Sequence, residues 1–303
     1  MKRILAIILL FYTVISSATD QNFVWVAQSG GSQESQCRAV WKEYDSLYNT
    51  STVVISGVSG LGGGLAVNEM LKSTYQNKFI CLGLGQYLLN HAFYPGQTKE
   101  NQLTPVITTS RIPIFWYVPN SNITNNYQEM LSYFRSLNRP INVGILFPSL
   151  KYVVPILEQQ GIAVNSVTYK TGPQQYPSLA DGTLDLAFDA GPGVQVALQT
   201  KKFRVAGYVD SSNHGNLINL NNFIWDEPNL AAMSAFSNML IAMPEDVSND
   251  TRKLLGQRLK KVVQSERFKS VVATFNGHPT GLTDHSLQQY IELQQRTVLK
   301  YWK

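Results

Sequence analysis

The sequence has little charge and few of the side chains that commonly carry catalysis or bind metals. Charged residues make up 15% of its 303 positions, and it has four histidines and two cysteines. None of the histidines has metal-ligand spacing to another histidine or to a cysteine. They are His91, His214, His278 and His285. We therefore expect no metal and no cofactor. The absence of like-charge runs and low-complexity segments argues against disorder.

The glycine-rich segments lack the residues that complete nucleotide-binding and hydrolase motifs. Residues 60–67, GLGGGLAV, contain no Lys-Ser or Lys-Thr pair after the glycines, which a phosphate-binding loop requires. A dinucleotide fingerprint would need a third glycine where Leu65 stands. A nucleophile elbow around Ser59 would need glycine in place of Leu61. These absences favour a protein that is not an enzyme.

One enzyme hypothesis stays open. Asp185 and Asp189 lie four residues apart in an expected strand, and hence on the same face of it. Paired carboxylates can do acid–base work, with Asp189 as a base near Tyr169 and Lys170. The simpler interpretation is that one aspartate caps a helix beside Gly191.

No apolar run reaches the length of about 20 residues that a membrane-spanning helix needs. The first 18 residues have the pattern of a cleavable secretory signal: Lys2 and Arg3, an apolar stretch from Ile4 to Ile15, and a small-residue site ending at Ala18. We therefore expect export to the periplasm. Cleavage leaves 23 basic and 20 acidic residues, a net charge of +3, which gives no reason to expect a nucleic-acid partner.

Two cysteines remain in the exported chain. Cys37 lies in an expected helix and Cys81 in an expected strand, so contact between them is possible. An exported protein could join them in a disulfide. Two buried free thiols are the alternative, and the sequence leaves the choice open.

Short β-branched or aromatic strands alternate with helices, which predicts an α/β fold with mostly parallel sheets. Two such series are joined by an extended apolar segment at 113–118, so we expect two lobes with a ligand cleft between them. The expected boundaries are 19–119 for the first part of lobe 1, 120–235 for lobe 2, and 236–303 for the C-terminal return to lobe 1. The predicted strands are 23–28, 52–56, 79–83, 141–147, 165–169, 184–190, 203–209 and 237–243. The predicted helices are 33–47, 63–73, 87–93, 127–137, 150–159, 174–182, about 248–274 with a break, and 284–302.

Two glycine-rich loops each follow a strand and open a helix, at 29–32 and 59–64. In open α/β sheets, ligands bind beyond the carboxyl ends of the strands. The N–H groups in the first turn of a helix have no partner within the helix, and the dipole is positive at that end. Such a site binds an anion without a charged side chain, and glycine lets the ligand come close to the backbone. The loops therefore predict a bound anion, most simply a carboxylate.

The order of these segments resembles the extracytoplasmic solute receptors of tripartite tricarboxylate transporters, the Bug-type receptors. Residues 27–38, AQSGGSQESQCR, are similar to the family's Pro-Gly-Gly-x-x-Asp-x-x-Ala-Arg loop, and SGLGG at 59–63 is similar to its Pro-Gly-Ala-Gly-Gly loop. Residues 104–121 resemble its Thr-Pro-Val segment and crossing strand. Residues 167–189 resemble its Pro-Tyr-Lys-Gly and Asp-Leu-Met-Phe-Asp block, and residues 203–212 resemble the strand that follows.

This chain departs from the family's pattern at several positions. Ser29 and Ser59 replace the prolines of the two loops, and Thr171 replaces the glycine that follows the lysine. The fourth loop, Ile145 to Leu150, is apolar instead of rich in serine and glycine. The ligand could therefore differ from the family's usual one.

The resemblance implies a two-lobed periplasmic binding protein, type II-like, that captures a small organic carboxylate between its lobes. Its implied partners are the ligand and membrane permease subunits, and we expect a monomer. An exported enzyme on the same scaffold, a ligand-presenting sensor and an orphan receptor are the alternatives. The candidate ligand-binding residues are Ser29, Gly30, Gly31, Ser32, Glu34, Ser59, Gly60, Gly62, Gly63, Gly85, Ser149, Tyr169 and Asp189.

Overall fold

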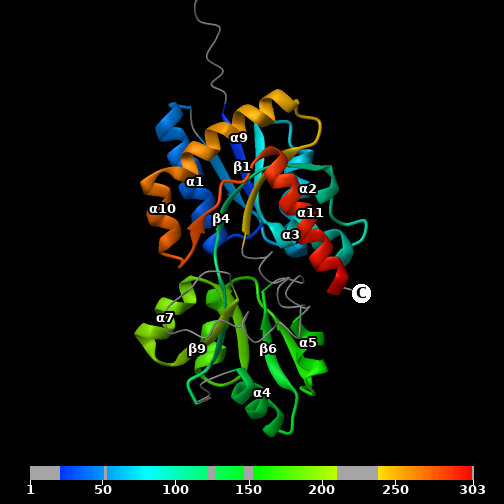
Figure 1. Ribbon diagram of the computed structural model, residues 1–303, viewed down its shortest axis with the longest axis vertical. Coiled ribbons are helices and arrows are strands. Elements are labelled where there is room, and N and C mark those ends of the chain that lie inside the picture. Colours follow the sequence, from blue (N-terminus) through cyan, green and yellow to red (C-terminus); the bar gives the residue numbers. More distant parts are fainter. Residues whose placement is uncertain (1–20, 51–52, 122–126, 147–152, 210–237, 302–303) are drawn as a thin grey trace, which may run out of the picture.

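The computed structural model describes residues 21–50, 53–121, 127–146, 153–209 and 238–301. They form two mixed sheets, each flanked by helices, in two lobes (Figure 1). None of the helices within these residues is long and apolar enough to cross a membrane.

The first lobe is built on a six-stranded sheet with the order β11-β4-β10-β3-β1-β2. Its strands are β1 (Asn22–Val26), β2 (Val53–Gly57), β3 (Lys78–Gly83), β4 (Leu103–Arg111), β10 (Asn238–Pro244) and β11 (His278–Pro279). Its helices are α1 (Ser32–Tyr48), α2 (Gly64–Lys72), α3 (Leu84–Phe93), α9 (Asn249–Gln264), α10 (Glu266–Ala273) and α11 (Asp284–Tyr301). Because β1 pairs in parallel with both β2 and β3, the loops that follow these strands meet at one edge of the sheet.

The second lobe is built on a five-stranded sheet with the order β7-β6-β8-β5-β9. Its strands are β5 (Ile114–Pro119), β6 (Ile141–Ile145), β7 (Val164–Thr168), β8 (Leu186–Ala190) and β9 (Phe203–Val209). Its helices are α4 (Tyr127–Ser136), α5 (Val153–Gln159), α6 (Tyr176–Ala180) and α7 (Pro192–Thr200). Strand β6 is parallel to β7 and β8, so the carboxyl ends of these three strands also share an edge.

Helix α1 shows why the sequence folds as it does in the first lobe. Its apolar residues Cys37, Val40, Trp41 and Tyr44 recur at helical spacing and are 0–4% exposed, so one face of the helix is buried against the sheet. The helix ends at Asn49, which takes the left-handed conformation that often closes a helix. The packing of α1 holds the first glycine loop at the edge of the sheet.

The structure contains two elements that the sequence analysis did not predict, and it places a third in the other lobe. Strand β4 was not predicted, because its buried Thr108, Thr109 and Ser110 interrupt the apolar pattern. Helix α7 was not predicted either, because Gly-Pro-Gly at its start is typical of a turn. The proline is compatible with the helix because it lies in the first turn. Strand β5 was assigned to the first lobe, but it pairs with β8 and β9, so the chain enters the second sheet between β4 and β5.

Candidate functional site

A cavity of about 200 Å³ lies where the two lobes meet. The first lobe contributes the end of β1, the Ser59–Gly63 loop and part of α3 with the residue after it. The second lobe contributes the ends of β6 and β7. Its lining consists of Ala27, Gln28, Ser59, Gly60, Leu61, Gly62, Gly63, Gln86, Tyr94, Leu146, Thr168, Tyr169 and Lys170. The carboxyl ends of parallel strands from both lobes thus face one space, as expected for a ligand site in this class of fold.

The Ser59–Gly63 loop has an unusual backbone. Four consecutive residues have positive φ: Gly60 at 144°, Leu61 at 49°, Gly62 at 63° and Gly63 at 103°. Only glycine adopts such angles without strain, and a leucine there is an outlier of the kind that gathers at functional sites. At Gly63 an added Cβ would also lie 2.7 Å from the Ala27 side chain. The glycines are therefore required by the conformation itself.

In this conformation, some backbone N–H groups of the loop have no hydrogen-bond acceptor among the described residues. The N–H of Gly63 bonds to the carbonyl of Gly60, and the N–H of Gly64 bonds to that of Leu61. The N–H groups of Gly60, Leu61 and Gly62 have no acceptor within the described part of the chain. Successive backbone N–H groups in a left-handed turn form a concave anion-binding site.

Side chains from α3 hold the loop from behind. The carbonyl of Gly62 accepts hydrogen bonds from Gln86 Nε2 at 2.8 Å and Asn90 Nδ2 at 3.0 Å. Asn90 also donates to Glu100 Oε1 at 3.0 Å, and Glu100 is only 1% exposed. Because the Gly62 carbonyl oxygen accepts these two hydrogen bonds, it does not repel an anion in the cavity.

The N-terminus of α2, which the sequence indicates as an anion site, has a carboxylate of the chain close to it. The carboxylate of Glu100 lies against it: a Cβ added to Gly64, the first residue of α2, would be 3.2 Å from Glu100 Oε1. A carboxylate of the chain itself therefore meets the positive end of this helix dipole. The loop N–H groups are therefore a better candidate for an anion site than the helix end.

The first glycine loop likewise binds a carboxylate of its own. Glu34 Oε2 accepts from the N–H of Gly30 at 2.7 Å and from Ser29 Oγ at 3.0 Å. The N–H of Ser29 donates to Ser59 Oγ at 3.0 Å, which ties the two loops together. The bond from Gly30 is the main cause that lowers the pKa of Glu34, and Arg38 also contributes. At least two N–H groups of this loop are therefore occupied.

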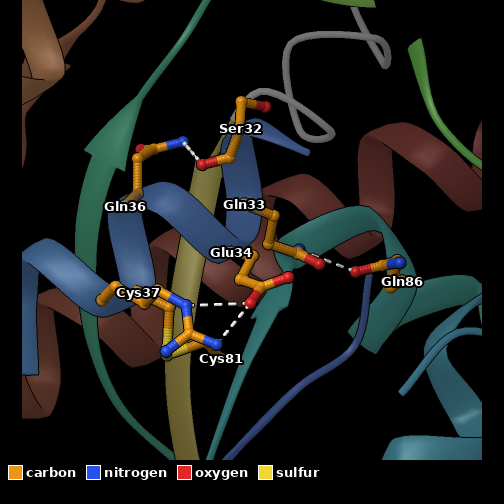
Figure 2. Close-up of a disulfide and its surroundings, with 8 residues drawn as sticks. Ser32, Gln33, Glu34, Gln36, Cys37, Cys81 and Gln86 are labelled. Carbon is orange, nitrogen blue, oxygen red and sulfur yellow. Dashed lines mark hydrogen bonds and ion pairs between the residues drawn. A yellow bond between two sulfur atoms is a disulfide. The ribbon is translucent and has the colours of Figure 1, made fainter. Parts of the chain in front are cut away.

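Arg38 forms an ion pair within α1. Its Nη2 pairs with Glu34 Oε1 at 2.5 Å, one turn along α1. Figure 2 shows Gln33 on the same turn pointing to Gln86, to which it donates at 3.0 Å. Because Gln86 also bonds to Gly62, this contact links the start of α1 to the second loop.

The cysteines form a disulfide, which settles the alternative that the sequence left open. Cys37 and Cys81 are joined, with their Cα atoms 6.1 Å apart, and both are fully buried (Figure 2). The bond fixes the second turn of α1 to β3.

The second lobe meets the first through the segment after β7. Gln28 Nε2 donates to the carbonyl of Lys170 at 3.2 Å, across the two lobes. The N–H of Lys170 donates to Gln174 Oε1 at 3.0 Å, and Tyr169 Oη donates to Ser178 Oγ at 3.1 Å. These bonds fix the backbone that carries Tyr169 and Lys170 at the cavity.

Asp185 and Asp189 do not form an acid–base pair. Asp185, just before β8, accepts two hydrogen bonds from Arg139 at 2.7 Å and one from the N–H of Asn142. Asp189, near the other end of β8, accepts a hydrogen bond from Tyr176. Burial, followed by the charge of Asp189, raises the pKa of Tyr176. Neither aspartate lines the cavity.

The fold has clear relatives of known structure, although the sequence matches no model of a known protein family and no curated protein. Rpa4515 from R. palustris, solved with adipate, has a TM-score of 0.78 at 18% identity, with 93% of this chain and 96% of that chain covered. MatC from Rhodopseudomonas palustris, solved with bound malate, has a TM-score of 0.73 at 14% identity, with 93% and 97% covered. The periplasmic binding protein BugD has a TM-score of 0.76 at 12% identity, with 93% and 95% covered. This chain has the periplasmic binding-protein fold.

Within the periplasmic binding-protein fold, the structure separates the candidate residues. Ser59, Gly60, Gly62, Gly63 and Tyr169 line the cavity. Residues that lie elsewhere are Ser29, Gly30, Gly31, Ser32, Glu34, Gly85 and Asp189. Ser149, with most of the apolar fourth loop, lies outside the described residues.

Sequence reasoning missed other residues that line the cavity. Gln28 and Lys170 directly flank predicted positions, and their place after a strand could have marked them. Gln86 and Tyr94 gave no such signal, since both depend on how α3 packs. Among the described residues no group of histidines, cysteines, aspartates and glutamates could hold a metal ion.

Proposed function

We propose that this protein is an extracytoplasmic receptor of the tripartite tricarboxylate type, which captures a small organic carboxylate in the cavity between its lobes. The observation that carries the proposal is that Gly60, Leu61 and Gly62 line the cavity and that their backbone N–H groups have no acceptor among the described residues. An oxyanion is the natural acceptor for such N–H groups.

The fold supports this proposal. Rpa4515 and MatC were solved with adipate and malate, which are both carboxylates. In the proposed mechanism the lobes move relative to each other, with the cavity closed by contacts such as the hydrogen bond from Gln28 to Lys170. The receptor would act as a monomer in the periplasm and deliver its ligand to permease subunits.

The loop alone does not explain tight binding. Three hydrogen bonds to a charged group contribute roughly 5–9 kcal/mol, at about 1.5–3 each. Association costs at least about 4 kcal/mol, so at best about 5 remain. Even that upper bound of about 5 kcal/mol corresponds to a dissociation constant of only about 0.2 mM. A receptor of higher affinity needs another group in the cavity to contact the carboxylate.

The alternative of an exported enzyme is less well supported. Its required base, Asp189, is 7% exposed, bonded to Tyr176 and not part of the cavity wall. Tyr169 is engaged with Ser178. The geometry therefore favours binding over chemistry at this site.

Thermal unfolding tests the proposal. Ligand-free protein lacking residues 1–18 is heated with a panel of carboxylates and with the matching neutral amides. A ligand that binds only the folded state stabilises it by about 2.7 kcal/mol at a hundredfold excess over its dissociation constant. We expect at least one carboxylate, and not its amide, to raise the melting temperature. A panel without any shift would contradict the proposal.

A matched pair of variants locates the site. Ser59→Asp places a negative charge at the cavity and keeps an acceptor for the N–H of Ser29. It should weaken carboxylate binding by at least about tenfold, because like charges repel. Ser35→Asp adds the same charge at an exposed position of α1 and should leave binding unchanged.

A further inference from the structure

Lys170 brings a positive charge to the cavity. It is the only charged residue among the described residues of the lining, and it is exposed. Its backbone is fixed on both sides, by Gln174 at 3.0 Å and by Gln28 of the other lobe at 3.2 Å. The bond from Gln28 brings Lys170 to the wall that carries the Ser59–Gly63 loop. Lys170 and the Ser59–Gly63 loop thus line one cavity from opposite lobes.

The rest of the described lining offers no second charge. Leu61, Tyr94 and Leu146 contribute apolar and aromatic surface. The amide of Gln86 is already engaged, because it accepts from Gly83 and Gln33 and donates to Gly62. A second carboxylate in the cavity would lose its water without gaining a cationic partner, which is strongly unfavourable.

Resting on the proposed function, we propose that the ligand is a monocarboxylate with an uncharged body. Its carboxylate is bound jointly by the loop N–H groups and the Lys170 ammonium, so Lys170 determines specificity. The uncharged body packs on Leu61, Tyr94 and Leu146. A cavity of about 200 Å³ is smaller than the roughly 300–1,000 Å³ typical of drug-sized ligands, so the body is short.

Calorimetric titration with pairs of equal carbon number tests this inference. The pairs are butanoate with succinate and hexanoate with adipate, added to the chain lacking residues 1–18. Lys170→Gln removes the charge and keeps the backbone carbonyl that bonds to Gln28. Lys170→Arg keeps the charge, and Lys202→Gln is the matched control at an exposed lysine of the same lobe. Thermal unfolding of each variant without ligand confirms that it folds.

The expected result has two parts. Of butanoate and hexanoate, the one that binds more tightly is compared with the dicarboxylate of equal carbon number. It should bind at least about tenfold more tightly than that dicarboxylate. Lys170→Gln weakens binding of this monocarboxylate by about ten- to a hundredfold, as expected for loss of a charge-assisted bond, while Lys170→Arg and Lys202→Gln change it by less than about threefold.

Other outcomes overturn the inference in distinguishable ways. Tighter binding of succinate or adipate, or monocarboxylate binding that survives Lys170→Gln, rejects Lys170 as the specificity residue and leaves the carboxylate receptor standing. The same holds if only carboxylates with a second charge bind. Failure of every carboxylate to bind the wild-type protein rejects the proposed function, and the inference falls with it.

Discussion

Removing the disulfide between Cys37 and Cys81 should strongly destabilise the first lobe. The bond closes a loop with a sequence separation of 44 residues. In the chain-entropy description, a loop of that length restricts the unfolded state by about 4 kcal/mol. For a chain of about 300 residues each kcal/mol corresponds to roughly 1.5–2 °C, so the melting temperature should fall by roughly 6–8 °C.

Urea unfolding with and without reductant measures the effect. The double variant Cys37→Ala, Cys81→Ala should unfold at lower urea than the oxidised protein, at one midpoint whatever the redox conditions. Reduced wild-type protein should move toward the same midpoint. Both cysteines are fully buried, so the alanines add a small packing loss to the entropic term.

Two results would refute this reasoning at different steps. Two titratable thiols in the unfolded, unreduced protein would show that the bond does not form. A wild-type protein whose stability changes by less than about 1 kcal/mol on complete reduction would show that the loop-entropy argument does not apply here.

The remaining predictions concern single side chains. Gly63→Ala should cost about 1–3 kcal/mol of unfolding free energy, because φ is 103° and the added Cβ clashes, while Gly31→Ala should change it by less than about 0.5 in urea unfolding. Asp185→Ala should cost about 2 kcal/mol by the same assay, since it removes the partner of Arg139. The folded-state pKa of Glu34 lies below its usual 4.5. Its contribution to the free energy of unfolding is therefore complete above pH 4.5 and is lost as the pH falls below that value. Glu34→Gln should therefore flatten the acid limb of a stability–pH profile, and an unchanged limb would contradict this.

Much of the alternation of strands and helices could be predicted, because the buried face of each element gives its apolar residues a helical or strand period. The buried face of α1 and the fully apolar β5 are examples. Strand β4 could not be found this way, since its buried polar residues depend on distant partners: Thr108 Oγ1, for instance, accepts hydrogen bonds from Thr280 and Leu282. The sheet to which β5 belongs depends on pairing partners about 70–95 residues away.

Part of the lining of the candidate cavity could be predicted from the sequence, but its contacts could not. Glycines after β1 and β2 marked the edge of the sheet correctly, and Ser59, Gly60, Gly62 and Gly63 line the cavity. The sequence does not reveal that Glu34 and Glu100 lie against the first loop and the α2 N-terminus, because both contacts are tertiary.

The conformation of the second loop also changes how it should be tested. Gly62→Asp is the obvious substitution for blocking anion binding at this loop. At Gly62, however, φ is 63° and a Cβ would lie 2.6 Å from Asn90 Oδ1, so any side chain there disturbs the fold. Ser59 offers the same test without that strain.

Backbone NMR of the loop tests the central claim most directly. The amide resonances of the protein lacking residues 1–18 are followed while the tightest-binding carboxylate is added to saturation. If the carboxylate is held by the second loop, the amide protons of Gly60, Leu61 and Gly62 should show the largest downfield shifts, while those of Ser29 and Gly30, already bonded to Ser59 and Glu34, should move little. Saturable binding that leaves Gly60, Leu61 and Gly62 unshifted would contradict the account.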